Sequence, residues 1–206
     1  MRVLCLDLSL HCGYAFFDSP VDDTIPKLVK YGTIHFDGPS VKERDSYPWS
    51  YVTVAEEHVN SLKNLWEEND PEVVVIEETN KGKNRYSQKM LEFLHHELLR
   101  KLMMEAVKVI YFDTSHWRSV LGIWMTKEQK KINAKINKAK RESGDSGARA
   151  MKKKLGVKGK TNKKHIAIAH VNQVFNLKLK VKDNDAADAI CLGLAYFKGA
   201  VPSDGT

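Results

Sequence analysis

The chain lacks the long apolar segments of a membrane protein. No run of about 18 apolar residues occurs among its 206 residues. The N-terminus does not have the pattern of a signal peptide either, because Asp7 and His11 interrupt its apolar residues. We therefore expect a cytosolic or nuclear protein without a membrane partner. The hydrophobic content of 42% is sufficient for the core of one well-packed domain.

Cysteine is scarce as well. The three cysteines, Cys5, Cys12 and Cys191, are odd in number and lack Cys-x-x-Cys spacing, which argues against a disulfide framework and against a structural zinc site. A zinc site built from Cys5, His11 and Cys12 is the weaker alternative, because free cysteines are common packing residues in protein cores.

Basic residues are concentrated in one segment. Residues 126–164 contain 15 Lys and Arg against three acidic residues, a net charge of +12, so the rest of the chain carries 7 − 12 = −5. A basic block in an otherwise acidic protein favours binding to a polyanion, with nucleic acid first and an anionic membrane surface second. The alternative is a solvated insertion that has no partner.

The spacing of apolar residues predicts an α/β fold. Alternation predicts strands at 3–8, 13–17 and 27–38, which form an antiparallel meander that begins with a hairpin. Two β-branched runs, "EVVVIEE" and "VKVIYFD", predict two further strands, the first of them covered on both faces. Helical spacing predicts helices at 52–65, at 90–103, after an N-cap at Thr114 or Ser115, from Lys163 onward, and after a cap at Asp183 or Asn184.

Strands followed by alternating helices and strands indicate a mixed sheet in a single domain that spans 1–206. A basic insertion at about 126–160 interrupts this domain. Within it, Ile132, Ile136 and Ala139 keep a helical spacing until "ESGDSGAR" breaks it.

Four acidic positions require an explanation. Asp7 lies inside an apolar strand, where an uncompensated charge costs several kcal/mol. Glu77, with Glu78 beside it, ends another strand, and Asp185 and Asp188 share one face of the last helix. Solvent exposure and helix capping are sufficient explanations for the last three residues taken singly, but not for Asp7.

Small residues in the last helix allow it to lie close to a sheet; they are Ala186, Ala187, Ala189 and Gly193. If that helix brings the four carboxylates together, their repulsion calls for divalent cations, and hard oxygen ligands favour Mg²⁺ or Mn²⁺ over zinc. Two such ions act on phosphodiesters in many enzymes, so an acidic cluster beside a basic insertion favours a nuclease.

The four acidic residues lie in three motifs, "VLCLDLSLHCGYAFFD", "PEVVVIEE" and "DNDAADAICLGLAY". Together these motifs resemble the RuvC-type Holliday junction resolvases of the ribonuclease H-like superfamily. The segments "FDTSHWRSVLG" and "GKTNKKHIAIAHVNQVF" fall in matching places, so the likeness covers nearly the whole chain. The Asp-x-x-Asp-Ala ending is its most specific part. The long basic insertion and the ending at Thr206 are more similar to bacteriophage-type members.

The resemblance implies a ribonuclease H-like, mixed five-stranded sheet flanked by helices. It also implies a homodimeric, Mg²⁺-dependent endonuclease that resolves four-way and other branched DNA by paired nicks, in the cytoplasm of a bacterium or a phage-infected host. By position it assigns the catalytic metal ligands to Asp7, Glu77, Asp185 and Asp188. Asp7 would bridge two Mg²⁺ ions, for which Mn²⁺ could substitute, and Glu77 and Asp188 would hold one each with help from Asp185.

The resemblance also assigns a catalytic lysine, and it has one clear departure. Lys164, with Lys163 as substitute, matches a lysine that could stabilise charge on the scissile phosphate. Bacterial members carry a junction-wedging aromatic residue three positions after the Glu, where this chain has Asn80, and Tyr86 is the alternative wedge. The expected DNA-binding residues are Lys81, Lys83, Arg85, Tyr86, Lys130, Lys131, Lys152, Lys153, Lys154, Lys158, Lys160 and Lys163.

Three other functions compete with this one. A ribonuclease H that acts on RNA–DNA hybrids shares the chemistry but not the Asp-Ala-Ala-Asp-Ala helix. An ATP-binding sugar-kinase-like protein shares the sheet but needs Gly-rich phosphate loops, which "DLSLHC" and "DNDAAD" do not provide. A non-catalytic nucleic-acid-binding protein leaves Asp7 unexplained. The apolar stripe from Met90 to Met103 suits either a dimer interface or the core.

Overall fold

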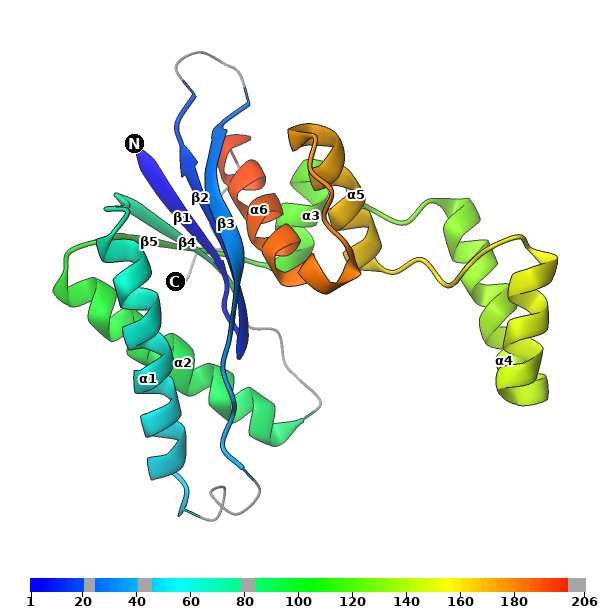
Figure 1. The fold of residues 1–206 in the computed structure, drawn as a ribbon, viewed down its shortest axis with the longest axis horizontal. Helices are drawn as coiled ribbons and strands as arrows, with labels where there is room; N and C mark the ends of the chain where they lie inside the picture. Colours follow the sequence, from blue (N-terminus) through cyan, green and yellow to red (C-terminus); the bar gives the residue numbers. More distant parts are fainter. Residues whose placement is uncertain (21–24, 41–45, 79–83, 200–206) are drawn as a thin grey trace.

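A five-stranded sheet forms the centre of the computed structural model, which describes residues 1–20, 25–40, 46–78 and 84–199 (Figure 1). The strand order is β3-β2-β1-β4-β5. β1, β2 and β3 form an antiparallel meander, and β4 and β5 run parallel to β1. The predicted mixed sheet with its N-terminal hairpin is therefore confirmed. The strands are β1 (Arg2–Asp7), β2 (His11–Asp18), β3 (Lys27–His35), β4 (Val73–Glu77) and β5 (Lys108–Phe112).

Helices cover both faces of the sheet, and each face has its own apolar core (Figure 1). One face carries α1 (Trp49–Glu67) and α2 (Arg85–Met104), and the other carries α3 (Thr114–Leu121), α5 (Lys163–Phe175) and α6 (Asn184–Phe197). Side chains of a strand alternate between the two faces. Accordingly Leu4 and Leu6 of β1 lie in the core below α1 and α2, whereas Val3 and Cys5 lie in the core below α6.

No helix in the described part of the chain is long and apolar enough to cross a membrane.

The apolar stripe of α2 belongs to the core. Met90, Leu94, Leu98 and Leu102 are buried against α1 and the sheet, whereas Met103 is 74% exposed. This stripe is therefore not available as a dimer interface, and core packing explains its spacing.

Two local predictions were wrong. Val52, the first apolar position of the spacing that predicts the helix at 52–65, is not in the core: it is 40% exposed, because Tyr51, one residue earlier, occupies that position on the buried face of α1. The N-cap of α3 is Asp113 rather than Thr114 or Ser115, since the Asp113 carboxylate accepts hydrogen bonds from the backbone N–H groups of Ser115 and His116. A carboxylate also favours the positive end of the helix dipole.

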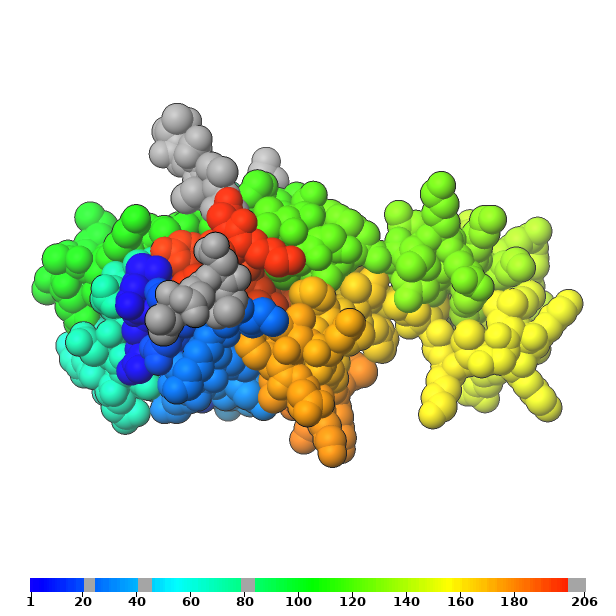
Figure 2. Space-filling view, turned by 90° about the horizontal axis from the view of Figure 1, so that it is seen from above, coloured from blue at the N-terminus to red at the C-terminus, as the bar shows by residue number. Residues whose placement is uncertain are grey.

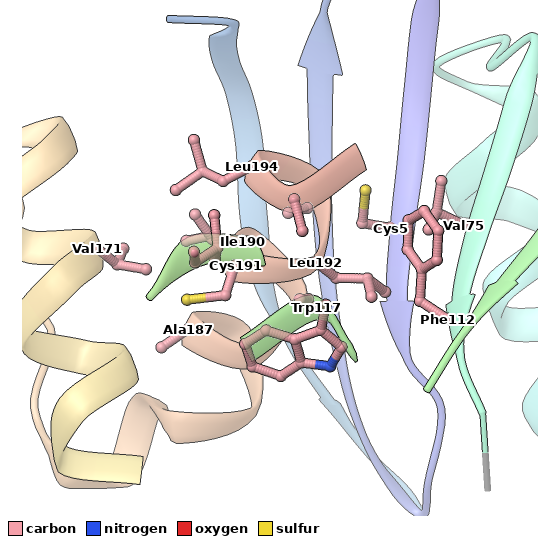
Figure 3. Packing of buried hydrophobic residues seen from close by; sticks show 14 of the residues in the cluster. Cys5, Val75, Phe112, Trp117, Val171, Ala187, Ile190, Cys191, Leu192 and Leu194 are labelled. Atoms are coloured by element: carbon pink, nitrogen blue, oxygen red, sulfur yellow. The ribbon is translucent and has the colours of Figure 1, made fainter. Parts of the chain in front are cut away.

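α6 lies in the centre of its face, where its buried side chains pack against those of the sheet and of α5 (Figure 3). Ala187, Ala189 and Gly193 of α6 are all buried, and the close contact with the sheet is at Gly193, where a Cβ atom would lie 2.2 Å from the Phe17 ring. This close packing brings the N-terminal turn of α6 to the ends of β1 and β2.

The basic insertion forms α4 (Lys127–Lys154), which projects away from the sheet (Figures 1 and 2). Thr126 and Gln129 form a capping box at its start. Ser143 and Gly144 have non-helical backbone angles, so the break predicted at "ESGDSGAR" is confirmed, and α4 folds into two halves. The halves touch, since a Cβ atom at Gly147 would lie 2.6 Å from the carbonyl oxygen of Ala139.

Candidate active site

Asp7 and Glu77 lie side by side at the ends of two parallel strands. Leu6 of β1 pairs with Ile76 of β4, so the next residues, Asp7 and Glu77, are neighbours. The alternation that places Cys5 and Val75 in the core below α6 directs Asp7 and Glu77 to that same face. Glu78 is one residue further on and is exposed. The strand geometry therefore favours Glu77 over Glu78 as the partner of Asp7.

The N-terminal turn of α6 brings two more carboxylates to this edge of the sheet. Gly13 of β2 pairs with Asp7, and a Cβ atom at Gly13 would lie 1.9 Å from the carbonyl oxygen of Asp185. Only glycine permits this approach. Asp188, one turn further along α6, is buried with 7% exposure. Asp7, Glu77, Asp185 and Asp188, called the acidic cluster below, are thus brought together from three elements.

α3 contributes two residues that contact the acidic cluster. Thr114 donates a hydrogen bond from its hydroxyl to Glu77, and Arg118 donates from Nη2 to Asp188 Oδ1 at 2.9 Å. The two residues are four positions apart and therefore share one face of α3. β5 is parallel to β4, with Phe112 beside Glu77, which places the start of α3 next to the cluster. Neither contact was predicted from the sequence.

Lys164 lies at the edge of the acidic cluster. An Asn162–His165 capping box starts α5, which fixes Lys163 and Lys164 in its first turn. Lys164 Nζ is 3.5 Å from Asp185 Oδ1, and Asn184 donates to the same oxygen. The predicted catalytic lysine is thus within reach of the carboxylates, with a side chain that is half exposed.

The carboxylates destabilise one another in their ionised forms. Burial raises the pKa of Asp7 well above its usual range, and the charges of the other three acidic residues raise it further, that of Glu77 most strongly. Burial also raises the pKa of Glu77 to about 7, although the Thr114 hydrogen bond opposes the shift. Burial raises the pKa of Asp188 as well, while Arg118 opposes it. The cluster is therefore short of positive charge.

The chemistry of this cluster fits a hard divalent cation. All four side chains offer carboxylate oxygens, and ionised carboxylates at this density require a cation to neutralise them. Within the described residues, no three His, Cys, Asp or Glu side chains are already arranged to hold a metal ion. Three of the carboxylates instead point to protein partners: Glu77 to Thr114, Asp188 to Arg118 and Asp185 to Lys164.

The predicted DNA-binding residues fall in three places. Arg85 and Tyr86 are exposed in the first turn of α2, and Lys81 and Lys83, like Asn80, lie outside the described residues. Lys163 is exposed at the start of α5. The others are on the basic insertion, where all but the partly buried Lys152 are exposed: Lys130, Lys131, Lys152, Lys153, Lys154, Lys158 and Lys160.

The basic insertion is anchored next to the acidic cluster. Its returning segment ends at Lys163, whose carbonyl oxygen accepts a hydrogen bond from Arg118 Nη1 at 3.4 Å. Asn133 of α4 ties this returning segment to the helix through both its side-chain groups: Nδ2 donates to the carbonyl oxygen of Thr161 at 2.6 Å, and Oδ1 accepts from the Thr161 backbone N–H at 3.1 Å. The insertion is called the basic arm (126–160) below.

The arrangement of these elements is found in solved structures. RuvC from T. thermophilus, in complex with a Holliday junction substrate, superimposes with a TM-score of 0.60 at 12% identity and covers 97% of this chain and 95% of that one. The fold is the RuvC fold. A second T. thermophilus RuvC structure gives a TM-score of 0.59 at 14% identity, covering 98% of this chain and 99% of that one.

A eukaryotic protein shares the RuvC fold with this chain. The yeast mitochondrial Holliday junction resolvase Ydc2 gives a TM-score of 0.53 at 14% identity, covering 95% of this chain and 77% of that one. No family model and no curated protein matches the chain in sequence. The predicted ribonuclease H-like fold class and the structural resemblance to RuvC-type resolvases are therefore confirmed by structure, at identities too low for a sequence match.

Proposed function

We propose that this chain is a Mg²⁺-dependent endonuclease that cuts four-way and other branched DNA by paired nicks. One observation carries the proposal. Asp7 and Glu77 end adjacent strands of a RuvC fold and meet Asp188 and Asp185 of α6, with the root of the basic arm beside them. A cation-requiring acidic cluster next to a strongly basic arm suits the cleavage of a nucleic-acid phosphodiester.

The choice of branched DNA follows from the fold comparison. T. thermophilus RuvC, which shares the fold over nearly the whole chain, was solved with a Holliday junction substrate. The Asp-Ala-Ala-Asp-Ala sequence at the start of α6 adds support, because this motif distinguishes the resolvase type from a ribonuclease that acts on RNA–DNA hybrids.

The carboxylates have the role of metal ligands in this proposal. Asp7 is central because Glu77 lies beside it at the end of the neighbouring strand, and the first turn of α6 lies on its other side. Asp188 keeps its Oδ2 atom for a metal while Oδ1 accepts from Arg118. When bound, one or two Mg²⁺ ions would polarise the scissile phosphate and help to ionise a water molecule. Thr114 orients Glu77 through its hydroxyl hydrogen bond.

Lys164 supplies a mobile positive charge in the same proposal. Its ammonium group is 3.5 Å from Asp185 and its side chain is half exposed, so it can turn toward a bound phosphate. A cation at that place stabilises the negative charge that develops on the phosphate oxygens during cleavage.

The basic arm is proposed to bind the DNA backbone. Its lysine and arginine side chains are spread over both halves of α4 and lead back to Lys163 and Lys164 at the acidic cluster. Neutralised phosphates release counterions, so the arm would supply sequence-independent affinity that falls with salt.

A homodimer would place two acidic clusters on one junction and so explain paired nicks. Because the stripe of α2 is part of the core, the interface has to use other surface, such as the exposed apolar side chains of Tyr47, Trp49 and Tyr86 near the starts of α1 and α2.

A cleavage panel tests the proposal. The protein with Mg²⁺ is incubated with a labelled four-way junction, a flap, a fork, a linear duplex of the same sequence and an RNA–DNA hybrid. We expect opposed nicks in the junction and weaker or no cleavage of the linear duplex. Equal cleavage of duplex and junction would refute the junction assignment, and preferred cleavage of the hybrid would favour a ribonuclease.

A further inference from the structure

Arg118 is a buried cation at the acidic cluster. The whole residue is only 3% exposed, and its Nη2 atom donates a hydrogen bond to Asp188 Oδ1 at 2.9 Å. Nη1 donates to the carbonyl oxygen of Lys163 at 3.4 Å, and the guanidinium carbon lies 4.2 Å from the centre of the Trp117 ring. A guanidinium group held on three sides is a fixed part of the site rather than a surface charge.

The positive charge of Arg118 acts on the carboxylates more strongly than that of Lys164. The side chain of Lys164 is 49% exposed, so water screens its charge, whereas that of Arg118 is 4% exposed and its charge is screened far less. Arg118 therefore acts directly on Asp188, which accepts its hydrogen bond at 2.9 Å.

A fixed cation at this place has two opposite consequences. In the metal-free protein it compensates Asp188, which would otherwise be a buried, unpaired charge and would destabilise the fold. A divalent ion held by Asp188 would be repelled by the same guanidinium, which also withdraws electron density from the Asp188 carboxylate through the hydrogen bond to Oδ1. Arg118 would thus keep the acidic cluster in shape without metal and make it bind metal less tightly.

We propose that Arg118 is a positioning residue, the resident counter-cation that holds Asp188 in place in the metal-free protein at the expense of affinity for divalent ions. The inference rests on the proposed metal-dependent function. It assigns to α3 a role in setting the metal concentration at which the site becomes active.

Mn²⁺ binding by the DNA-free protein tests this inference. Calorimetric titration with Mn²⁺ and thermal unfolding with and without Mn²⁺ are compared for the wild type, Arg118→Met, Arg118→Lys and Arg2→Met. Arg2 is the control for loss of an Arg–Asp pair alone, because it pairs with Asp18 at 2.8 Å at the opposite end of β1, where both side chains are partly exposed. If Arg118→Met does not fold, Arg118→Gln, which keeps a donor for Asp188, takes its place.

We expect Arg118→Met to melt lower than the wild type without metal. It should bind Mn²⁺ about tenfold more tightly, because the repulsion between the guanidinium and the divalent ion is removed. Arg118→Lys should stay near the wild-type affinity because it keeps the charge, and Arg2→Met should lose stability only. Unchanged or weaker Mn²⁺ binding by Arg118→Met, or by the Gln variant in its place, would overturn the inference. A wild type that binds no Mn²⁺ would instead contradict the proposed function.

Discussion

Substitution of Gly13 should disturb the geometry of the acidic cluster without removing any of its functional groups. In Gly13→Ala the new Cβ atom would lie 1.9 Å from the carbonyl oxygen of Asp185 and 2.2 Å from its carbonyl carbon. Real Cβ contacts are not shorter than 3.0 Å, so β2 and the first turn of α6 have to move apart by at least 3.0 − 1.9 = 1.1 Å. This displacement separates Asp185 and Asp188 from Asp7.

The expected magnitudes follow from that displacement. A misplacement of about 1 Å in an active site lowers the rate about 100-fold. Overpacking of a close contact costs about 1–3 kcal/mol of stability. We therefore expect Gly13→Ala to fold, to bind junction DNA through the basic arm, and to cleave it about 100-fold more slowly than the wild type.

Gly193→Ala is the matched control for this experiment. Gly193 lies on the same helix, eight residues or about 12 Å from Asp185, and its new Cβ atom would meet the Phe17 ring at 2.2 Å. It should lower stability to a similar extent with little effect on the cleavage rate. The assay is single-turnover cleavage of a labelled four-way junction at a temperature where both variants are folded. Equal rates for the two variants would contradict the role of Gly13 in placing Asp185 and Asp188 beside Asp7.

Three further predictions concern the basic arm and the core. The double variant Lys130→Gln, Lys131→Gln should bind the junction more weakly, and the slope of log binding constant against log salt concentration should fall by about 2 when binding is measured by fluorescence anisotropy. The control variant Lys108→Gln on β5 should change neither quantity. Asn133→Ala should weaken junction binding without changing the salt slope, since it releases the returning segment but removes no charge. Burial lowers the pKa of His58 to about 4, so folding favours its neutral form. The stability that this neutral ring contributes is complete above the unfolded pKa near 6.5 and is lost as the pH falls toward 4. Between pH 7 and pH 5, the free energy of unfolding of His58→Phe, measured with urea, should therefore fall by about 2 kcal/mol less than that of the wild type.

Each of these predictions has a clear contradiction. A salt slope that is the same in the double lysine variant and in the wild type would make these two arm residues spectators. A reduced slope in Asn133→Ala would mean that its effect is electrostatic. Parallel pH profiles for His58→Phe and the wild type would show that the His58 ring is not held neutral by burial.

The sheet and the acidic positions were predictable because their signals are local. Alternation of apolar residues fixes which face each side chain takes, and this parity alone places Asp7 and Glu77 together once their strands are parallel neighbours. The small residues of α6 likewise indicate a helix seated closely on a sheet. A charge inside an apolar strand was the strongest single signal, since burial without compensation is costly.

The contacts from α3 were not predictable, because they depend on tertiary structure alone. Arg118 is 70 residues from Asp188 along the chain, and a helix after a strand carries many polar side chains that face solvent. The only sequence signal is the spacing of four between Thr114 and Arg118, which is too common to be specific. The fold-back of α4 was missed in part for the same reason: the break at Ser143 and Gly144 was predicted, but the packing of Gly147 on Ala139 requires coordinates.

Asp7→Asn separates the role of the acidic cluster in catalysis from DNA binding. The substitution keeps the size of the side chain and removes the carboxylate that borders both Glu77 and α6. Junction binding and junction cleavage in Mg²⁺ are measured on the same preparation. Binding should be retained and cleavage lost, whereas cleavage that persists in Asp7→Asn would contradict the acidic cluster as the catalytic site.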